Sequence, residues 1–592
     1  MGPRFASRSI LAACALSALC AIQPAGAGEG EGSPAPLAKL LANVEREPLL
    51  FFGVPDIHKL PARLAQAHLG QFLLDERYAE GRARLAKELG DAAGADLDSL
   101  WVNLRAHLEG PVALVLTRAA PLDEGDVPGF KLRLLASVPN AKSMEAVEAA
   151  WPRLPPQSGS LLSLLRPQLV AGDAAAAPPS PPAWVKEYAE TPGLARFRAR
   201  PEALGVALHE WTQALPESGA LGWMQAVRYL AALKLETVAL DLRLEGGQFE
   251  ERLALKPLAG AEGGFVRLLD ALRQRPRGWD GLTTALPSGS ALGVLFQLEP
   301  RKLGADLAIH LQLFERMLRG KKWTEQQGVS EDALRGDRFD FLMAHATGMG
   351  GIVARPSPTG KVDLVLALAS RERDVTVLRA KLVEGLGRLE APFQTLQQAP
   401  RIGENAPLAA QFKGRGVLPA PVLGLSAGWI WLCSTTGAYH DLTAAFGGGK
   451  TLKEAPPPAQ PDPLAAPFTR PESSTLRLDM NLEALAPLAY TAWLLSEDGP
   501  RLGDWRVPGE VLPQPGLFAG RLGWLQADLA PRADGTFLGY ARGPLPFGSL
   551  LSVGVLGRAG EAVDQVKRGR EALKDELRRL NEQDETSKAQ AP

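Results

Sequence analysis

Residues 49–56 read Leu-Leu-Phe-Phe-Gly-Val-Pro-Asp, and residues 57–64 continue Ile-His-Lys-Leu-Pro-Ala-Arg-Leu. An apolar run, a turn signal and a leucine-spaced run in this order predict a strand that feeds a helix. Three later stretches repeat the pattern, at residues 194–204, 291–303 and 475–485. Four such openings indicate a chain that was built by repetition.

Strand hairpins follow the openings. Residues 111–116 and 130–137 read as two paired strands, and residues 238–244 and 249–255 as two more around the turn Glu245-Gly246-Gly247. A later turn at Asp534-Gly535 completes a similar pattern. In residues 476–481 apolar and polar side chains alternate, which predicts a strand with one buried and one wet face.

These patterns divide the chain into four predicted units in the order A, B, A′, B′, in which A′ resembles A and B′ resembles B. We predict an α+β fold of tandem repeated units, with antiparallel sheets, helices packed on one face, and two homologous halves. Chance similarity among Leu/Ala-rich segments is the alternative explanation. The predicted organisation is a signal peptide at 1–27, a flexible leader at 28–46, α+β unit A at 47–182, α+β unit B at 183–285, α+β unit A′ at 286–450, a Pro-rich linker at 451–472, α+β unit B′ at 473–558, a C-terminal amphipathic helix at 559–583 and a disordered tail at 584–592.

The C-terminal helix carries a narrow apolar stripe, in which Val566, Leu573 and Leu580 recur every seven residues. Stable coiled coils usually sustain three to four heptads, so this stripe suits docking at the edge of a core better than zipping two chains. We expect the helix to pack against unit B′ and the chain to be a monomer.

Export is predicted from the first 27 residues. They combine Arg4 and Arg8, an apolar run at residues 10–22 that is too short to span a bilayer, and the small residues Ala-Gly-Ala at 25–27. This order is typical of a secretory signal peptide. Cys14 offers a lipoprotein as the alternative, but few apolar residues separate it from Arg8.

Composition limits the possible functions. The 592 residues are 46% hydrophobic and 22% charged, with a formal net charge of −1. This is the composition of a globular protein with real cores, and it gives no basic excess for nucleic acid. No later stretch is apolar enough for a transmembrane helix. A mature chain would keep Cys433 alone, so no internal disulfide is expected.

The openings and the layout resemble a family of large exported bacterial proteins of unknown function. The resemblance rests on the Leu-Phe-Phe-Gly-Val-Pro-Asp motif at 50–56 and the leucine-rich helix after it. It implies repeated strand–helix units and brings no catalytic residues.

The most tempting catalytic motif is Gly-Leu-Ser-Ala-Gly at residues 424–428, which fits the Gly-x-Ser-x-Gly of hydrolase elbows. Such an elbow needs a helix directly after the serine. Ser426 is instead followed by the apolar residues 429–433, which read as a strand, so a hairpin or loop turn is the better interpretation. His440 and Asp441 are adjacent, which places them poorly as base and orienting acid.

Other candidates have structural interpretations. Residues 447–451 and 348–351 match only parts of phosphate-binding loops and lack the strand–loop–helix context. The histidines show no metal-ligand spacing; His310 lies beside leucines on one predicted helix face. Cys433 is predicted to be a buried inert thiol. The pairs Trp429/Trp431 and Trp505/Trp524 could line a ligand surface, but core packing is the better explanation, because aromatic residues dominate core burial.

We therefore assign no catalytic, cofactor-binding or metal residue. The sequence favours a non-catalytic binding or scaffolding protein that acts outside the cytoplasm, in the periplasm or beyond, with a protein or envelope component as its partner. A serine hydrolase that uses Ser426 and a carrier of an apolar ligand are the alternatives.

Overall fold

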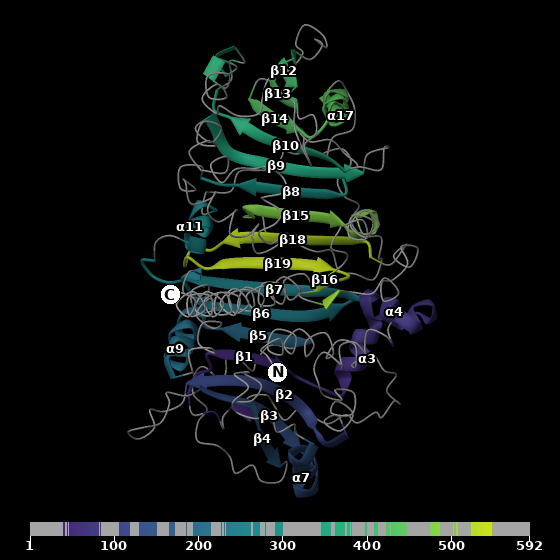
Figure 1. Ribbon diagram of the computed structural model, residues 1–592, viewed down its shortest axis with the longest axis vertical. Helices are drawn as coiled ribbons and strands as arrows, with labels where there is room; N and C mark the ends of the chain where they lie inside the picture. Colours follow the sequence, from purple (N-terminus) through teal and green to yellow (C-terminus); the bar gives the residue numbers. More distant parts are fainter. Residues whose placement is uncertain are drawn as a thin grey trace, which may run out of the picture.

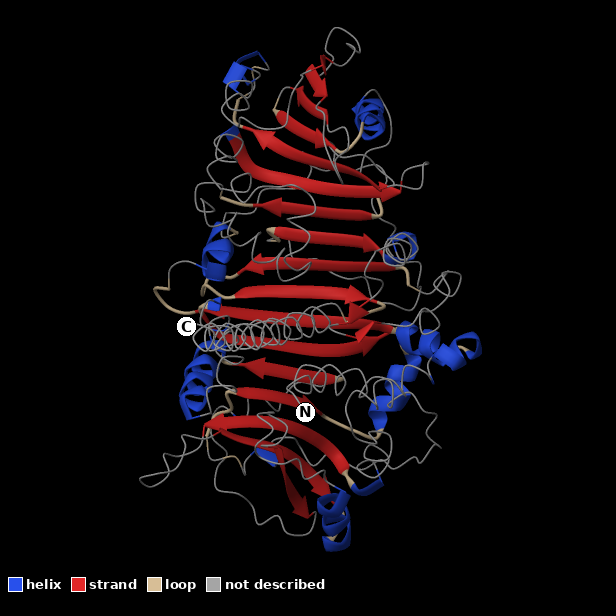
Figure 2. Ribbon diagram, in the orientation of Figure 1, coloured by secondary structure: helices blue, strands red, loops and turns tan. Residues whose placement is uncertain are grey.

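The computed structural model shows a molecule whose strands stack one beside another along its longest axis (Figures 1 and 2). It describes residues 40–41, 44, 46–81, 83, 106–118, 130–150, 165–171, 185, 193–214, 227, 230, 233–261, 264–272, 279, 290–299, 345–356, 362–372, 374, 376–378, 380–381, 397–398, 408–411, 422–426, 428–446, 474–485, 501–502, 505–506 and 522–546. The predicted signal peptide, the Pro-rich linker, the C-terminal helix and the tail lie outside these residues.

The first half of the described chain contains β1 (Leu50–Val54), α3 (Lys59–Gln66), α4 (His68–Leu74), the short 3-10 helix η1 (Glu76–Tyr78), β2 (Glu109–Arg118), β3 (Phe130–Val138), α7 (Ala141–Ala150), β4 (Leu165–Ala171), β5 (Ala195–Ala199), α9 (Pro201–Ala214), β6 (Leu235–Glu245), β7 (Gln248–Pro257) and α11 (Gly264–Ala271). The second half contains β8 (Leu292–Gln297), β9 (Ala346–Pro356), β10 (Val362–Ser370), β11 (Gln397–Gln398), β12 (Leu408–Gln411), β13 (Val422–Ser426), β14 (Trp429–Cys433), α17 (Thr436–Phe446), β15 (Leu476–Asn481), β16 (Arg501–Leu502), β17 (Trp505–Arg506), β18 (Trp524–Pro531) and β19 (Phe537–Gly543).

One sheet contains all of these strands except β16 and β17, which pair with each other. Its spatial order is β4-β3-β2-β1-β5-β6-β7-β19-β18-β15-β8-β9-β10-β14-β13-β12-β11. Neighbouring strands are antiparallel, apart from the parallel pair β3–β4. The prediction of antiparallel pairing is confirmed, but the units share one sheet instead of forming several.

The two halves of the chain meet at one strand pair, which we call the seam. There β7 runs antiparallel to β19, with Phe249 opposite Gly543 and Phe537 opposite Leu255. These strands are nearly 300 residues apart in sequence, so their pairing could not be read from local patterns.

The structure confirms the predicted strand–helix order at two openings and the predicted hairpins. β1 leads into α3 and β5 leads into α9, as the repeated openings predict. The hairpins β2–β3, β6–β7 and β18–β19 all form, with turns at the predicted glycines of the last two. Within the described ranges no helix is long and apolar enough to cross a membrane.

Both faces of the sheet carry helices, which corrects the prediction of helices on one face. Directly opposite residues on neighbouring strands share a face. One row of such partners therefore runs along the first face from β1 to β14: Gly53, Arg196, Asp241, Arg252, Tyr540, Asp528, Arg477, Leu295, Gly351, Ala367 and Trp431.

At its two ends the first face is apolar. Phe51 and Val115 pack there under Leu40 and Leu41, and at the far end Trp431 packs under α17. The second face, which carries Phe52, supports α7, α9 and α11 instead. Figure 1 shows α9 and α11 along one side of the sheet and α17 near the end opposite α7.

The helical region after β1 docks on the β6–β7 hairpin through Gly247. The His68 amide N–H donates to the Gly247 carbonyl at 2.8 Å. Gly247 has a φ of +78°, and a Cβ at this position would lie 2.6 Å from His68 Cδ2. Only glycine satisfies both conditions, because an L side chain is strained at this φ and would collide with the imidazole.

On β15 the polar side of the first face is half-buried instead of fully solvated. All six residues of β15 are half-buried, whereas the alternation predicts a buried and a solvated side. β15 lies between β8 and β18, and its Arg477 contacts an aspartate that is wholly removed from solvent. The alternation identified the polar face correctly, but on β15 solvent reaches that face only in part.

Candidate functional site

Charged and polar side chains form two rows across the central six strands of the first face, and we call these rows the central ladder. The first row contains Arg196, Asp241, Arg252, Tyr540, Asp528 and Arg477 on β5, β6, β7, β19, β18 and β15. The second row contains Arg243, Glu250, Arg542, Gln526 and Asp479 on β6, β7, β19, β18 and β15.

The first row has an ion pair at each of its two ends. Arg196 donates to Asp241 from Nε at 2.5 Å and from an outer nitrogen at 3.2 Å. Arg477 Nε lies 3.2 Å from an Asp528 carboxylate oxygen, and the guanidinium also sits 5.6 Å from the ring centre of Trp279. The Asp528 side chain has no exposed surface, whereas that of Asp241 is 26% exposed.

The second row crosses the seam. Arg542 on β19 donates from Nε to the Gln248 side-chain oxygen at 2.8 Å and lies 3.6 Å from a Glu250 oxygen. Arg542 and Gln248 are both buried. Gln526 donates to Asp479 at 3.1 Å, so each of the four carboxylates of the ladder is already engaged.

Three hydrogen-bond donors of the ladder, Arg243, Arg252 and Tyr540, have no carboxylate partner among the described residues. Arg252 is exposed, and Tyr540 directly opposite it is half-exposed; neither contacts a carboxylate among the described residues. Arg243 holds a buried Nε without a hydrogen-bond acceptor. These three side chains belong to adjacent strands β6, β7 and β19, at the seam.

Ser426 occupies the hairpin turn that its sequence context predicts. It ends β13 opposite Trp429, which begins β14, and Gly428 between them has a φ of +88°. The helix that a nucleophile elbow requires is therefore replaced by a strand. α17 begins later, at Thr436.

Cys433 is fully buried, as predicted, between Val365 on β10 and Val422 on β13. Removal from water, and next the negative charge of Asp363, raises the pKa of the thiol to about 12. Because the thiolate is the nucleophilic form, this cysteine is chemically inert at neutral pH.

The remaining sequence candidates do not converge. Across the described ranges no three His, Cys, Asp or Glu side chains are placed to hold a metal ion. The His58 ring bonds the Leu108 carbonyl at 2.7 Å, and Glu210 beside His209 pairs with Arg118. His310 and residues 447–451 lie outside the described residues. Gly350 and Gly351 lie within β9, and Trp429 and Trp431 both pack in the core under α17.

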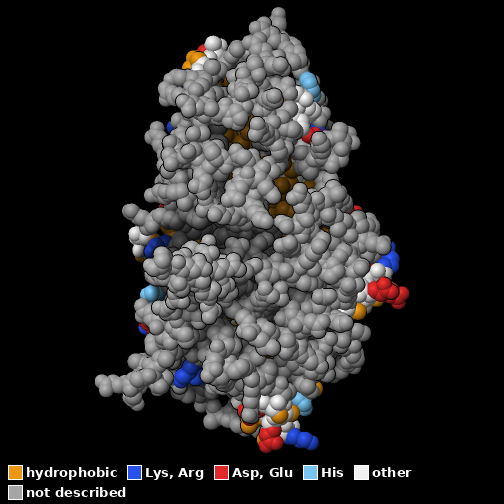
Figure 3. All heavy atoms as spheres, in the orientation of Figure 1, with side chains coloured by type: hydrophobic (Ala, Val, Ile, Leu, Met, Phe, Trp, Pro, Cys, Tyr) orange, Lys and Arg blue, Asp and Glu red, His pale blue; other side chains and the backbone are white. Residues whose placement is uncertain are grey.

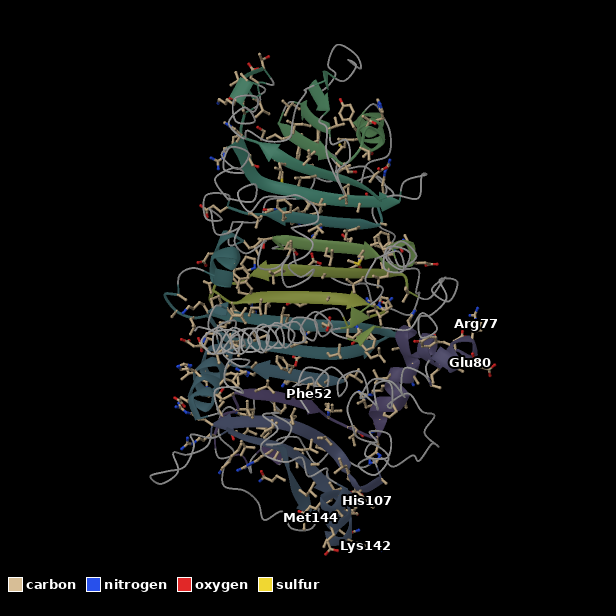
Figure 4. All side chains as sticks on the ribbon, viewed as in Figure 1. Phe52, Arg77, Glu80, His107, Lys142 and Met144 are labelled. Carbon is tan, nitrogen blue, oxygen red and sulfur yellow. The ribbon has the colours of Figure 1, made fainter. Side chains whose placement is uncertain are left out.

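The view in Figure 3 shows few described side chains. Those with charge lie over α4, over the end that carries α7, and along the side where Figure 1 places α9 and α11. In Figure 4 the labelled Arg77 and Glu80 extend from the first of these regions, and Lys142 from the second.

Sequence reasoning missed the ladder, although one signal was present. Arg196 and Arg477 each stand five residues before a similar sequence, which is Pro-Glu-Ala-Leu at 201–204 and Leu-Glu-Ala-Leu at 482–485. Asp241 and Asp528 likewise precede a leucine in matching hairpin strands. Aligning the predicted repeats by these residues would have pointed to two ion pairs, Arg196 with Asp241 and Arg477 with Asp528.

Comparisons with known proteins give little further information. No family model matches the chain, and no curated protein matches it. One solved structure, titled "Structure of crystal form III of TP0453", matches 42% of this chain and 74% of its own at 10% identity, with a TM-score of 0.22. A score this low supports no argument about fold or function.

Proposed function

We propose that the protein is a non-catalytic binding or scaffolding protein that acts outside the cytoplasm, after removal of residues 1–27. The observation that carries the proposal is the continuous sheet, whose central face presents ion-paired side chains and three donors that no carboxylate among the described residues engages. With neighbouring strands about 4.8 Å apart, the sheet from β4 to β11 extends over roughly 75 Å. A stiff platform of this length suits an extended partner in the cell envelope.

We also propose that the platform consists of two homologous halves. Outward from the seam the order is β7, β6, β5, β1, β2, β3 on one side and β19, β18, β15, β8, β9, β10 on the other. In both directions the first two strands form the hairpin of unit B or B′, and the third is the opening strand of that unit. The fourth is the opening strand of unit A or A′, and the last two form the hairpin of that unit. The ion pairs Arg196–Asp241 and Arg477–Asp528 occupy matching places, with Arg252 and Tyr540 opposite each other at the centre.

A second candidate function is the carriage of an apolar ligand. On the second face Phe52, in the middle of β1, is 40% exposed, and it lies between Leu114 and Phe197 on the neighbouring strands (Figure 4). Ile352 on β9 is 37% exposed on the same face. An apolar ligand bound over β1 would cover the exposed ring of Phe52.

The proposed function is tested on protein purified from its native envelope. We expect mass spectrometry to show a mature chain that begins near Gly28, and chemical cross-linking before lysis to join it to an envelope component. Broad ester and peptide screens should show no turnover, in the wild type or in the Ser426→Ala control. An intact Met1, a lipid on Cys14, or turnover that Ser426→Ala abolishes would overturn the proposal. Lipid extracted from the same preparation would favour the carrier instead.

A further inference from the structure

We propose that Arg243, Arg252 and Tyr540 form a binding site for a phosphate group at the seam of the sheet. The inference names a ligand class for the proposed binding function and therefore rests on it. The three side chains lie on the first face, where Arg252 is directly opposite Tyr540 across the seam. Arg243 is two residues along β6 from Asp241, which lies directly opposite Arg252 on the next strand.

This placement brings the donors within reach of one ligand. Diagonal neighbours on adjacent strands are about 7–8 Å apart at the backbone, so two long arginine side chains can meet on a single group between them. Tyr540 lies directly opposite Arg252 and contributes a hydroxyl group from β19. The site thus exists only because β7 and β19 pair.

The donors are available because the neighbouring acids are engaged. Asp241 is bound to Arg196, Asp528 to Arg477, and Glu250 lies beside Arg542. The buried Nε of Arg243 lacks an acceptor. A buried donor without a partner destabilises a protein, and a bound ligand is one explanation for such a group.

The chemistry of the donors favours phosphate. Two guanidinium groups carry two positive charges, and a phosphate monoester near neutral pH carries about −1.5 to −2. The planar fork of arginine matches phosphate oxygens with two parallel hydrogen bonds, and the tyrosine hydroxyl can donate to a third oxygen. The phosphate could belong to a soluble anion or to the headgroup of a lipid, and both present the same oxygens.

The test uses the full mature chain and two probes. Calorimetric titration with inorganic phosphate measures soluble binding, and co-sedimentation with phosphatidylcholine vesicles, with and without phosphatidic acid, measures headgroup binding. We expect one of the two probes to bind. The double variant Arg243→Gln/Arg252→Gln should weaken that binding at least about tenfold, because charge-assisted hydrogen bonds are the strong ones. Tyr540→Phe should weaken it several-fold while leaving both charges in place.

The matched control is Arg63→Gln, which removes an exposed arginine from α3 and should leave binding unchanged. The probe that binds should also raise the melting temperature of the wild type and of the control but not of the double variant, which separates lost binding from lost folding. Binding of inorganic phosphate alone identifies a soluble ligand, and binding of phosphatidic acid vesicles alone identifies a lipid. Binding of neither probe, or equal loss in Arg63→Gln, would overturn the site. A protein that captures an envelope component yet ignores both probes would keep the proposed function and lose this inference.

Discussion

Replacing Asp528 by asparagine is expected to destabilise the protein by about 3–5 kcal/mol, the cost of breaking a buried ion pair from one side. The carboxylate of Asp528 is fully buried and lies 3.2 Å from Arg477 Nε. Asparagine preserves the shape but removes the charge, so the largely buried guanidinium of Arg477 loses its counterion. Urea denaturation followed by tryptophan fluorescence measures the change in the free energy of unfolding.

Asp241, at the opposite end of the same row, provides the control. Asp241→Asn breaks the pair with Arg196, but the Asp241 side chain is 26% exposed, so water replaces part of the interaction. We expect about 1 kcal/mol for this variant. Adding Arg477→Met to Asp528→Asn should recover most of the loss, because an apolar side chain needs no counterion. A loss for Asp528→Asn no larger than that for Asp241→Asn would show that burial does not set the strength of these pairs.

Trp431→Ala is expected to cost about 3–5 kcal/mol, as is typical for removing a large aromatic side chain from a core. Trp431 is 1% exposed and packs with Tyr439 and Leu442 of α17. A Cβ added at Gly424 on β13 would lie only 3.2 Å from its ring, so the indole fills the space between β13 and the helix. The cavity left behind could not be filled by small movements.

Trp429→Ala is the matched variant, since Trp429 lies on the same strand and face but is only half-buried. We expect it to cost clearly less, about 1–2 kcal/mol, in proportion to the smaller apolar area that it buries. Thermal unfolding of the two variants beside the wild type gives the comparison. If Trp429→Ala were the more damaging, the packing of α17 on the first face would be wrong.

The sequence predicts those parts of this fold that are local. Alternation and turn glycines locate β6 and β7 around Gly246 and Gly247, and leucine spacing after a turn locates α3 and α9. These signals arise from contacts between residues close in sequence, so a linear reading can detect them.

The shared sheet depends on distant pairings that no local pattern records. Any strand with one apolar and one polar face could pair with several others, and the choice of β5 for β1, or β8 for β15, is made by the packing of the whole chain. For the same reason the alternation in β15 suggested one solvated face, whereas its polar residues are half-buried and Arg477 pairs with Asp528 on the neighbouring strand. The candidate phosphate site was invisible because its donors come from β6, β7 and β19.

The seam is central to this organisation, because it joins the halves and creates the phosphate site. An engineered disulfide tests it directly. Ala254 on β7 lies directly opposite Leu538 on β19, and both lie on the first face. Directly opposite Cβ atoms are about 4.5–5.5 Å apart, close to the spacing that a disulfide requires.

The control pairs Ala254 with Ala541, whose side chain belongs to the second face. We expect mass spectrometry of oxidised Ala254→Cys/Leu538→Cys to show a peptide linking residues 254 and 538, with no such link in Ala254→Cys/Ala541→Cys. No link in the first variant, or equal linking in both, would contradict the seam.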